Sequence, residues 1–88
     1  MTWDGARPWT LHPSVGLRPE PFGALAYHYG TRRLTFLKDP QLTALVRTLA
    51  DHPSGEAALV AAGVSDGQRP AFEAALGRLS DAEVICAR

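Results

Sequence analysis

The stretch YHYGTRRLTFLKDP, residues 27–40, indicates a β-hairpin that leads directly into a helix. Its Gly30-Thr31 pair is the kind that a two-residue type II′ loop requires. Asp39-Pro40 combines a good helix N-cap with a residue suited to the first helical position. The loop sets the register, with Tyr29 opposite Arg32, Tyr27 opposite Leu34 and Leu25 opposite Phe36. The stretch therefore predicts an antiparallel sheet whose last strand has a free edge.

The two faces of this predicted hairpin differ in polarity. Residues opposite one another in antiparallel strands share a face. One face therefore gathers Leu25, Tyr27, Leu34 and Phe36, and the other carries Ala26 with Thr35 and His28 with Arg33. We expect helices to cover the apolar face and His28 to be a surface residue beside Arg33.

The segments around the hairpin complete a single small domain. Strands are predicted at about 14–18, 22–29 and 32–37, and helices at about 40–51, 55–62 and 68–80. Ser54 is a suitable N-cap for the second helix, Gly63 a suitable stop, and Pro70 falls in the first turn of the third helix. Two helices joined by a short glycine-containing turn have helix-turn-helix proportions. The order predicts an α+β, winged helix-turn-helix-like domain over 14–88, a three-stranded antiparallel sheet followed by three helices.

The two ends of the chain carry weaker patterns. Residues 1–13 contain two prolines and two tryptophans, which predicts a loose N-terminal arm with Trp9 and Leu11 as anchors. Near the other end, the apolar pair Val84-Ile85 indicates a short extended segment or an irregular helix end.

Composition limits the possible functions. The 88 residues suffice for one domain with a modest core. Basic and acidic residues balance overall, but residues 1–38 have a net charge of +3 and residues 39–88 a net charge of −3. This balance disfavours a general nucleic-acid binder. The absence of a long apolar run argues against a membrane protein and favours a cytoplasmic one.

The residues that usually carry chemistry do not cluster in the sequence. His12, His28 and His52 lack metal-ligand spacing, and Cys86 alone forms neither a disulfide nor a cysteine metal site. No nucleophile elbow, phosphate loop or dinucleotide fingerprint occurs. The sequence therefore predicts no enzyme, no cofactor and no metal.

Two binding functions fit the predicted fold. A DNA-binding helix 3 would expose a set with balanced charge, namely Gln68, Arg69, Glu73, Arg78 and Asp81. Alternatively, the free edge of the last strand accepts a peptide as an additional strand. Arg32 and Arg33 would then attract carboxylates of the peptide, but together with Lys38 they are equally typical of cations that protect an unpaired edge. The residues alone leave peptide addition and edge protection about evenly balanced.

The block LRPEPFGALAYHYGTRRLTFL, residues 17–37, resembles the peptide chaperones of mycofactocin biosynthesis. The runs WTLHPSV, residues 9–15, and LVRTLADHPS, residues 45–54, add to a resemblance that covers about residues 9–80. That family is similar to the chaperone of pyrroloquinoline quinone biosynthesis. Both are RiPP recognition elements, which bind ribosomally made peptides that are later modified.

The resemblance implies a function and a site. The leader region of the mycofactocin precursor peptide would add to the third strand, lie against helix 3 and be delivered to a radical S-adenosylmethionine maturase, which would hold the iron–sulfur clusters. The implied peptide-binding residues are Arg32, Arg33, Leu34, Thr35, Phe36, Arg69, Phe72, Glu73 and Leu76. The alternative is a winged helix-turn-helix DNA-binding regulator. A continuous basic face on helix 3 would favour DNA, and a mixed apolar groove would favour a peptide.

Overall fold

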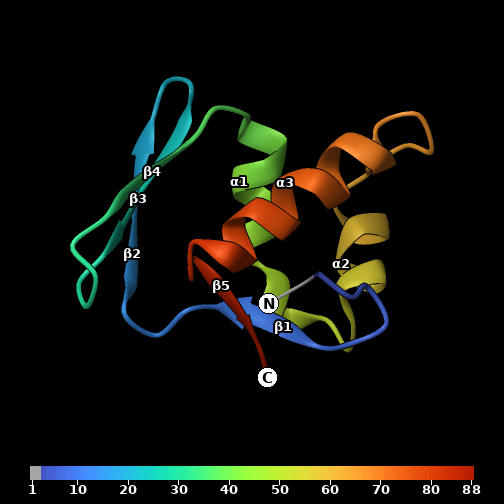
Figure 1. Cartoon of the computed structure of the whole chain (residues 1–88). Helices are drawn as coiled ribbons and strands as arrows, with labels where there is room; N and C mark the ends of the chain where they lie inside the picture. The colour runs from blue at the N-terminus through green and yellow to red at the C-terminus, as the bar shows by residue number, and fades with distance from the viewer. Residues whose placement is uncertain (1–2) are drawn as a thin grey trace.

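The hairpin belongs to a three-stranded antiparallel sheet in the computed structural model of the chain, which describes residues 3–88 (Figure 1). The strands are β2 (Val15–Glu20), β3 (Gly23–His28) and β4 (Leu34–Leu37), in the order β2-β3-β4. Leu25 lies opposite Phe36, and Tyr27 lies opposite Leu34. The predicted register is therefore confirmed for these two pairs, whereas the predicted pair of Tyr29 with Arg32 is not part of the ladder.

The loop that joins β3 to β4 differs from the predicted type II′ turn. Gly30 lacks the positive φ that this turn requires, whereas Arg32 takes a φ of 62°. The His28 carbonyl accepts a hydrogen bond from the Arg32 amide at 2.7 Å. In addition, His28 Nδ1 accepts from the Gly30 and Thr31 amides at 3.0 and 3.1 Å. The imidazole thus fixes a longer loop that keeps the same register.

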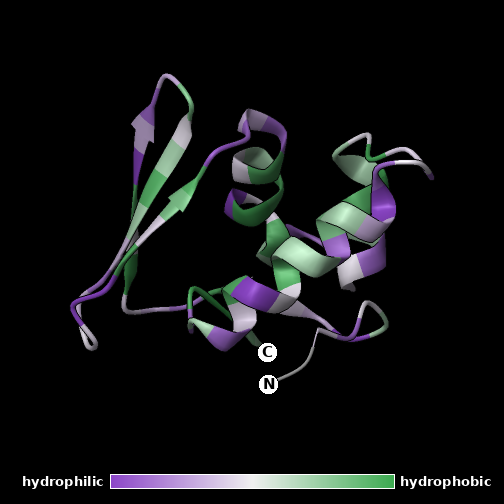
Figure 2. Ribbon diagram, turned by 45° about the horizontal axis from the view of Figure 1, so that its top comes forward, coloured by the Kyte–Doolittle hydropathy of each residue, from purple (hydrophilic) through white to green (hydrophobic). Residues whose placement is uncertain are grey.

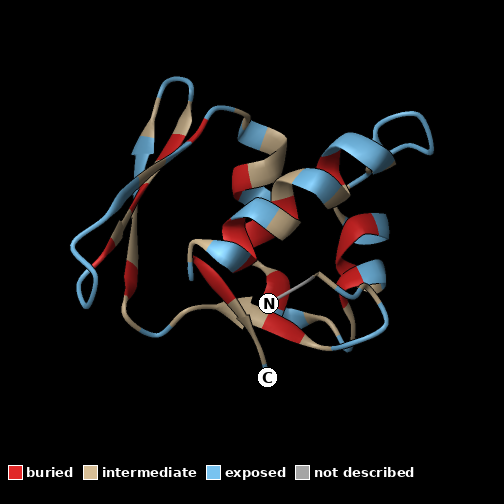
Figure 3. Cartoon of the chain, viewed as in Figure 1, coloured by how far each residue is buried: buried red, intermediate tan, exposed pale blue. Residues whose placement is uncertain are grey.

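The sheet packs on the helices through the face that was predicted to be exposed. Ala24 and Ala26 are fully buried, and His28 is only 6% exposed. By contrast, Leu34 and Phe36 on the other face are 54% and 58% exposed (Figure 3). The predicted orientation of the sheet and the surface position of His28 were therefore wrong. Small alanine side chains let the helix that follows β4 lie close to β3.

Three helices follow the sheet, so the predicted α+β class is confirmed. They are α1 (Pro40–Arg47), α2 (Gly55–Ala61) and α3 (Arg69–Asp81), with a 3₁₀ turn, η1 (Leu49–Asp51), after α1. The Asp39 carboxylate accepts from the Gln41 amide, and the Ser54 hydroxyl accepts from the Ala57 amide. Gly63 ends α2 with a φ of 75°. The winged helix-turn-helix likeness stays a prediction.

The N-terminal segment is a part of the fold, so the predicted loose arm was wrong for residues 3–13. β1 (Trp9–Leu11) pairs antiparallel with β5 (Ile85–Ala87), a strand at the other end of the chain. The Gly55 and Glu56 amides at the start of α2 donate to the carbonyls of Arg7 and Gly5, both at 2.9 Å. The rest of the predicted arm, residues 1–2, lies outside the described residues.

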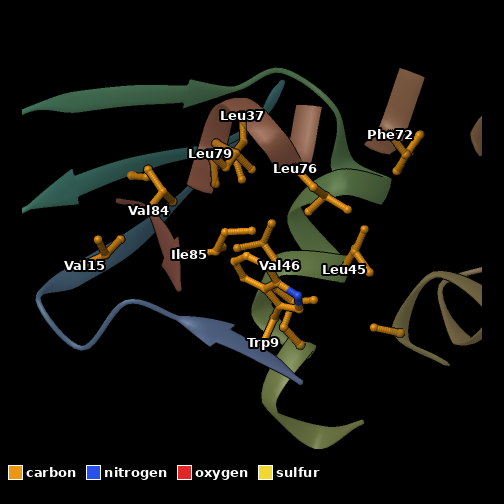
Figure 4. Close-up of a cluster of buried hydrophobic side chains, with 14 of the residues drawn as sticks. Trp9, Val15, Leu37, Leu45, Val46, Phe72, Leu76, Leu79, Val84 and Ile85 are labelled. Carbon is orange, nitrogen blue, oxygen red and sulfur yellow. The ribbon is translucent and has the colours of Figure 1, made fainter. Parts of the chain in front are cut away.

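Trp9 is the largest of the fully buried side chains in the core, at 1% exposed (Figure 4). Its indole N–H donates to the Asp4 carbonyl at 2.8 Å, and Trp3 packs against it with ring centroids 4.9 Å apart. Leu11 packs against the core from the same strand, so both predicted anchors are confirmed. The other large, fully buried side chains are Leu37, Leu45, Leu49, Leu59, Leu76, Ile85, Val46 and Val84.

Candidate functional site

The free edge of β4 offers main-chain groups for another strand. The His28 amide donates to the Arg33 carbonyl at 3.0 Å, which marks this pair as hydrogen-bonded. Hydrogen-bonded and non-hydrogen-bonded pairs alternate along antiparallel strands. Thr35 therefore bonds inward to Ala26, while the N–H and C=O groups of Leu34 and Phe36 point to the free edge. This edge can form up to four main-chain hydrogen bonds with a peptide.

A groove of about 330 Å³ lies beside this edge, between the end of β4, the start of α1 and one side of α3. Its wall is mainly apolar, and two cations border it. The lining residues are Phe36, Lys38, Asp39, Leu42, Ala71, Phe72, Ala75 and Arg78. The Asp39 carboxylate already caps α1. The groove therefore suits a peptide with apolar side chains next to a carboxylate.

The structure brings together only part of the predicted peptide-binding set. Leu34, Thr35 and Phe36 form β4, and the exposed Arg32 and Arg33 immediately precede it. On α3, the predicted residues point in different directions. Phe72 lines the groove, whereas Leu76 is fully buried in the core.

The predicted charged pair on α3 lies away from the groove. Arg69 contacts Glu56 of α2 at 3.1 Å and Glu73 at 3.8 Å, so these side chains link two helices. Sequence reasoning did not assign Ala71, Ala75 and Arg78 to the peptide site. Their spacing of four and three residues places them on one side of a helix, which is the available signal.

The charges on α3 do not form a continuous basic face. Arg69 is engaged with two carboxylates, and Arg78 stands next to the apolar groove. This arrangement matches the mixed apolar groove that favours a peptide over DNA.

Two of the histidines and the single cysteine lie where they support the fold. The His12 and His28 rings pack with centroids 4.6 Å apart, and Cys86 lies in β5 opposite Thr10. Across residues 3–88, no three His, Cys, Asp or Glu side chains are grouped to hold a metal ion. Within the same residues, the structure contains no helix that is both long and apolar enough to span a membrane.

Comparison with known proteins identifies the family. The profile of the Peptide chaperone MftB family matches residues 8–86. The chain belongs to this family. A relative named Peptide chaperone MftB from Mycolicibacterium smegmatis is 48% identical over 85 residues, which cover 97% of this chain and 83% of the relative. The relative of the same name from Mycobacterium tuberculosis is 46% identical over 86 residues, with coverages of 98% and 79%. No solved structure matches the chain.

Membership of the Peptide chaperone MftB family confirms the family that the block at residues 17–37 suggested. It supports a peptide-chaperone role and implies that the partner is a peptide. The free edge of β4 and the groove beside α3 are the features of the described structure that fit such a partner.

Proposed function

We propose that this domain is a non-catalytic cytoplasmic chaperone that binds the leader of the mycofactocin precursor peptide and presents it to a radical S-adenosylmethionine maturase. The observation that carries the proposal is the unpaired edge of β4 next to the apolar groove on α3. Membership of the Peptide chaperone MftB family supports the same role.

Strand addition to β4 explains how a small sheet can bind a peptide. The free N–H and C=O groups of Leu34 and Phe36 would pair with the peptide main chain. Each such bond contributes about 0.5–1.5 kcal/mol net, so the backbone alone gives modest affinity without selecting a sequence. Selection would come from apolar side chains that enter the groove and from carboxylates near Lys38 and Arg78.

The chaperone would promote the reaction without making or breaking a bond. Holding the leader on the domain raises the effective concentration of the peptide's other end at the maturase. The iron–sulfur clusters and S-adenosylmethionine would belong to the maturase.

The proposal is tested by an amide NMR titration of the labelled domain with the precursor peptide. We expect shifts in β4 and in the groove side of α3, residues 71–78. Two variants isolate the main-chain contribution. Leu34→Pro removes an N–H at the free edge, whereas Leu34→Ala keeps that N–H and removes most of the side chain. The proline variant should bind the peptide about tenfold more weakly than the alanine variant, provided that circular dichroism shows both to be folded.

Equal peptide affinity in the two folded Leu34 variants would contradict strand addition at this edge. An unchanged spectrum of the native domain at saturating peptide, with and without the maturase, would contradict the chaperone function itself.

A further inference from the structure

The outer face of the β2-β3-β4 sheet carries an uncovered apolar patch. We define the outer patch as Phe22, Leu25, Tyr27, Tyr29, Leu34 and Phe36. Five large hydrophobic side chains are exposed in the described chain, and four of them belong to this patch. Figure 2 shows apolar segments along these strands, far from α2 and β1. Such a concentration on one face typically marks an interaction surface.

The outer patch has paired aromatic rings and hollows, so its surface is uneven as well as apolar. The Tyr27 and Tyr29 rings pack edge to face at 5.0 Å, and the Phe22 and Phe36 rings lie 6.0 Å apart. These pairs border two shallow hollows, one over β2 and β3 and one beside Lys38. Gly16 opposite Tyr27 leaves room for the Tyr29 hydroxyl, since a Cβ at Gly16 would lie 2.9 Å from that oxygen. A surface with aromatic anchors and hollows suits a folded protein surface.

The charges around the patch specify the chemistry of its partner. Arg18 lies on the outer face, Lys38 borders the second hollow, and Arg32 occupies the hairpin loop, whereas Arg33 pairs with His28 of the inner face. The patch's neighbouring carboxylate, Glu20, is already paired with Arg18 at 2.8 Å. Within the described residues, Arg32 and Lys38 form no ion pair. Two copies meeting face to face would oppose these cations, which disfavours self-association through the patch.

Strand addition leaves this face open. A peptide that pairs with the β4 edge lies in the plane of the sheet, so it widens the outer face and adds its own outward side chains to it. The hollow beside Lys38 also joins the patch to the groove, because Phe36 and Lys38 line both the hollow and the groove. A protein seated on the outer patch would therefore contact the domain and the bound peptide together.

We propose that the outer patch docks the enzyme that modifies the bound peptide, through an enzyme surface with an apolar centre and a border of carboxylates. This inference rests on the proposed function. Because the docked enzyme touches both chains, peptide and enzyme strengthen each other's binding to the domain by the same factor.

The experiment compares the full native chain with Tyr27→Thr/Tyr29→Thr, which keeps a strand-compatible residue in β3, changes a turn residue just after it and leaves the β4 edge intact. Val60→Thr is the matched control, because Val60 is 70% exposed on α2, outside the patch. Affinities for the precursor peptide and for the maturase are measured separately, and then for the maturase with peptide present. The double variant should bind the peptide as the native chain does, but the maturase at least tenfold more weakly. Val60→Thr should match the native chain in both.

Each other outcome has a distinct meaning. If the native chain binds no peptide, the proposed function fails, and the docking inference fails with it. If the native chain binds peptide and maturase, and the folded double variant binds the maturase equally well, only the docking inference fails.

Loss of peptide binding in the double variant would instead show that the outer patch binds the leader peptide. Patch-dependent binding to anionic phosphatidylserine vesicles, with unchanged maturase binding, would assign it to a membrane. If the double variant unfolds, the single Tyr29→Thr variant, at a 67% exposed position, decides between the same outcomes.

Discussion

The two faces of the β2-β3-β4 sheet differ in the size of their side chains and in what these side chains contact. The inner face is buried: it carries Ala24 and Ala26, and its hydrogen-bonded His28 packs on the His12 ring. The outer face presents Leu25, Tyr27 and other large side chains to solvent. Small residues let the helices approach closely, while large ones remain available for partners. The contrast teaches that side-chain size alone does not identify the face that forms the core.

A buried charge tests the inner face most severely. Ala26→Glu places a carboxylate in the core with no cation assigned to it, so we expect the free energy of unfolding to fall by about 3 kcal/mol or more. The matched change on the outer face, Leu25→Glu, should cost about 1 kcal/mol or less. Urea denaturation measures both. Similar losses at the two positions would contradict the assignment of inner and outer faces.

Removing the imidazole tests the polar end of the inner face. His28→Leu keeps an apolar group but deletes the Nδ1 acceptor of the Gly30 and Thr31 amides. We expect a loss of about 1–2 kcal/mol in the free energy of unfolding, with faster hydrogen exchange at these two amides. Tyr29→Leu, on the exposed side of the same hairpin, should stay within about 0.5 kcal/mol of the native chain. Unchanged exchange at Gly30 and Thr31 would show that the imidazole does not hold the loop.

Truncating Phe36 separates the groove from the rest of the outer face. Phe36→Ala should weaken peptide binding about tenfold, or about 1.4 kcal/mol, because this ring lines the groove. Tyr29→Ala should leave peptide affinity unchanged. Isothermal calorimetry with the precursor peptide gives both constants. A larger loss at Tyr29 than at Phe36 would place the peptide on the outer face rather than at the β4 edge.

Substitutions in the loop between β3 and β4 should change the free energy of unfolding least. Arg32 takes a positive φ, which costs a residue with a side chain about 1 kcal/mol relative to glycine. Arg32→Gly should therefore raise the free energy of unfolding by up to about 1 kcal/mol, whereas Thr31→Gly should lower it slightly. A lower free energy of unfolding in Arg32→Gly would contradict this expectation. It would mean that the Arg32 side chain stabilises the loop by more than its positive φ costs.

The sequence predicted the elements whose signals are local. The hairpin register, the caps at Asp39 and Ser54 and the stop at Gly63 each depend on a few adjacent residues. The orientation of the sheet was not predictable in this way, because strict alternation defines two faces without saying which one meets the helices. Pairing between β1 and β5 had no local signal, since its partners lie at opposite ends of the chain.

The candidate site was only partly accessible from the sequence. The β4 edge followed from the hairpin, but the direction of each α3 side chain depends on how the helix is rotated against the sheet. Leu76 fills the core, and Arg69 reaches α2, whereas Arg78 borders the groove. Moving by one or two residues on a helix changes the side it presents by 100° or more, so a spacing pattern alone does not fix that rotation.

The pairing of β1 with β5 has a consequence for synthesis on the ribosome. Trp9 is translated 76 residues before Ile85, although the two side chains lie in the same core cluster (Figure 4). At 5–20 residues per second, the indole waits roughly 4–15 seconds for that strand to be translated. Until then the hairpin and α1 can form, but the core cannot close. The largest side chain of the core therefore stays exposed to solvent through most of translation, in a domain that is proposed to hold another protein's peptide.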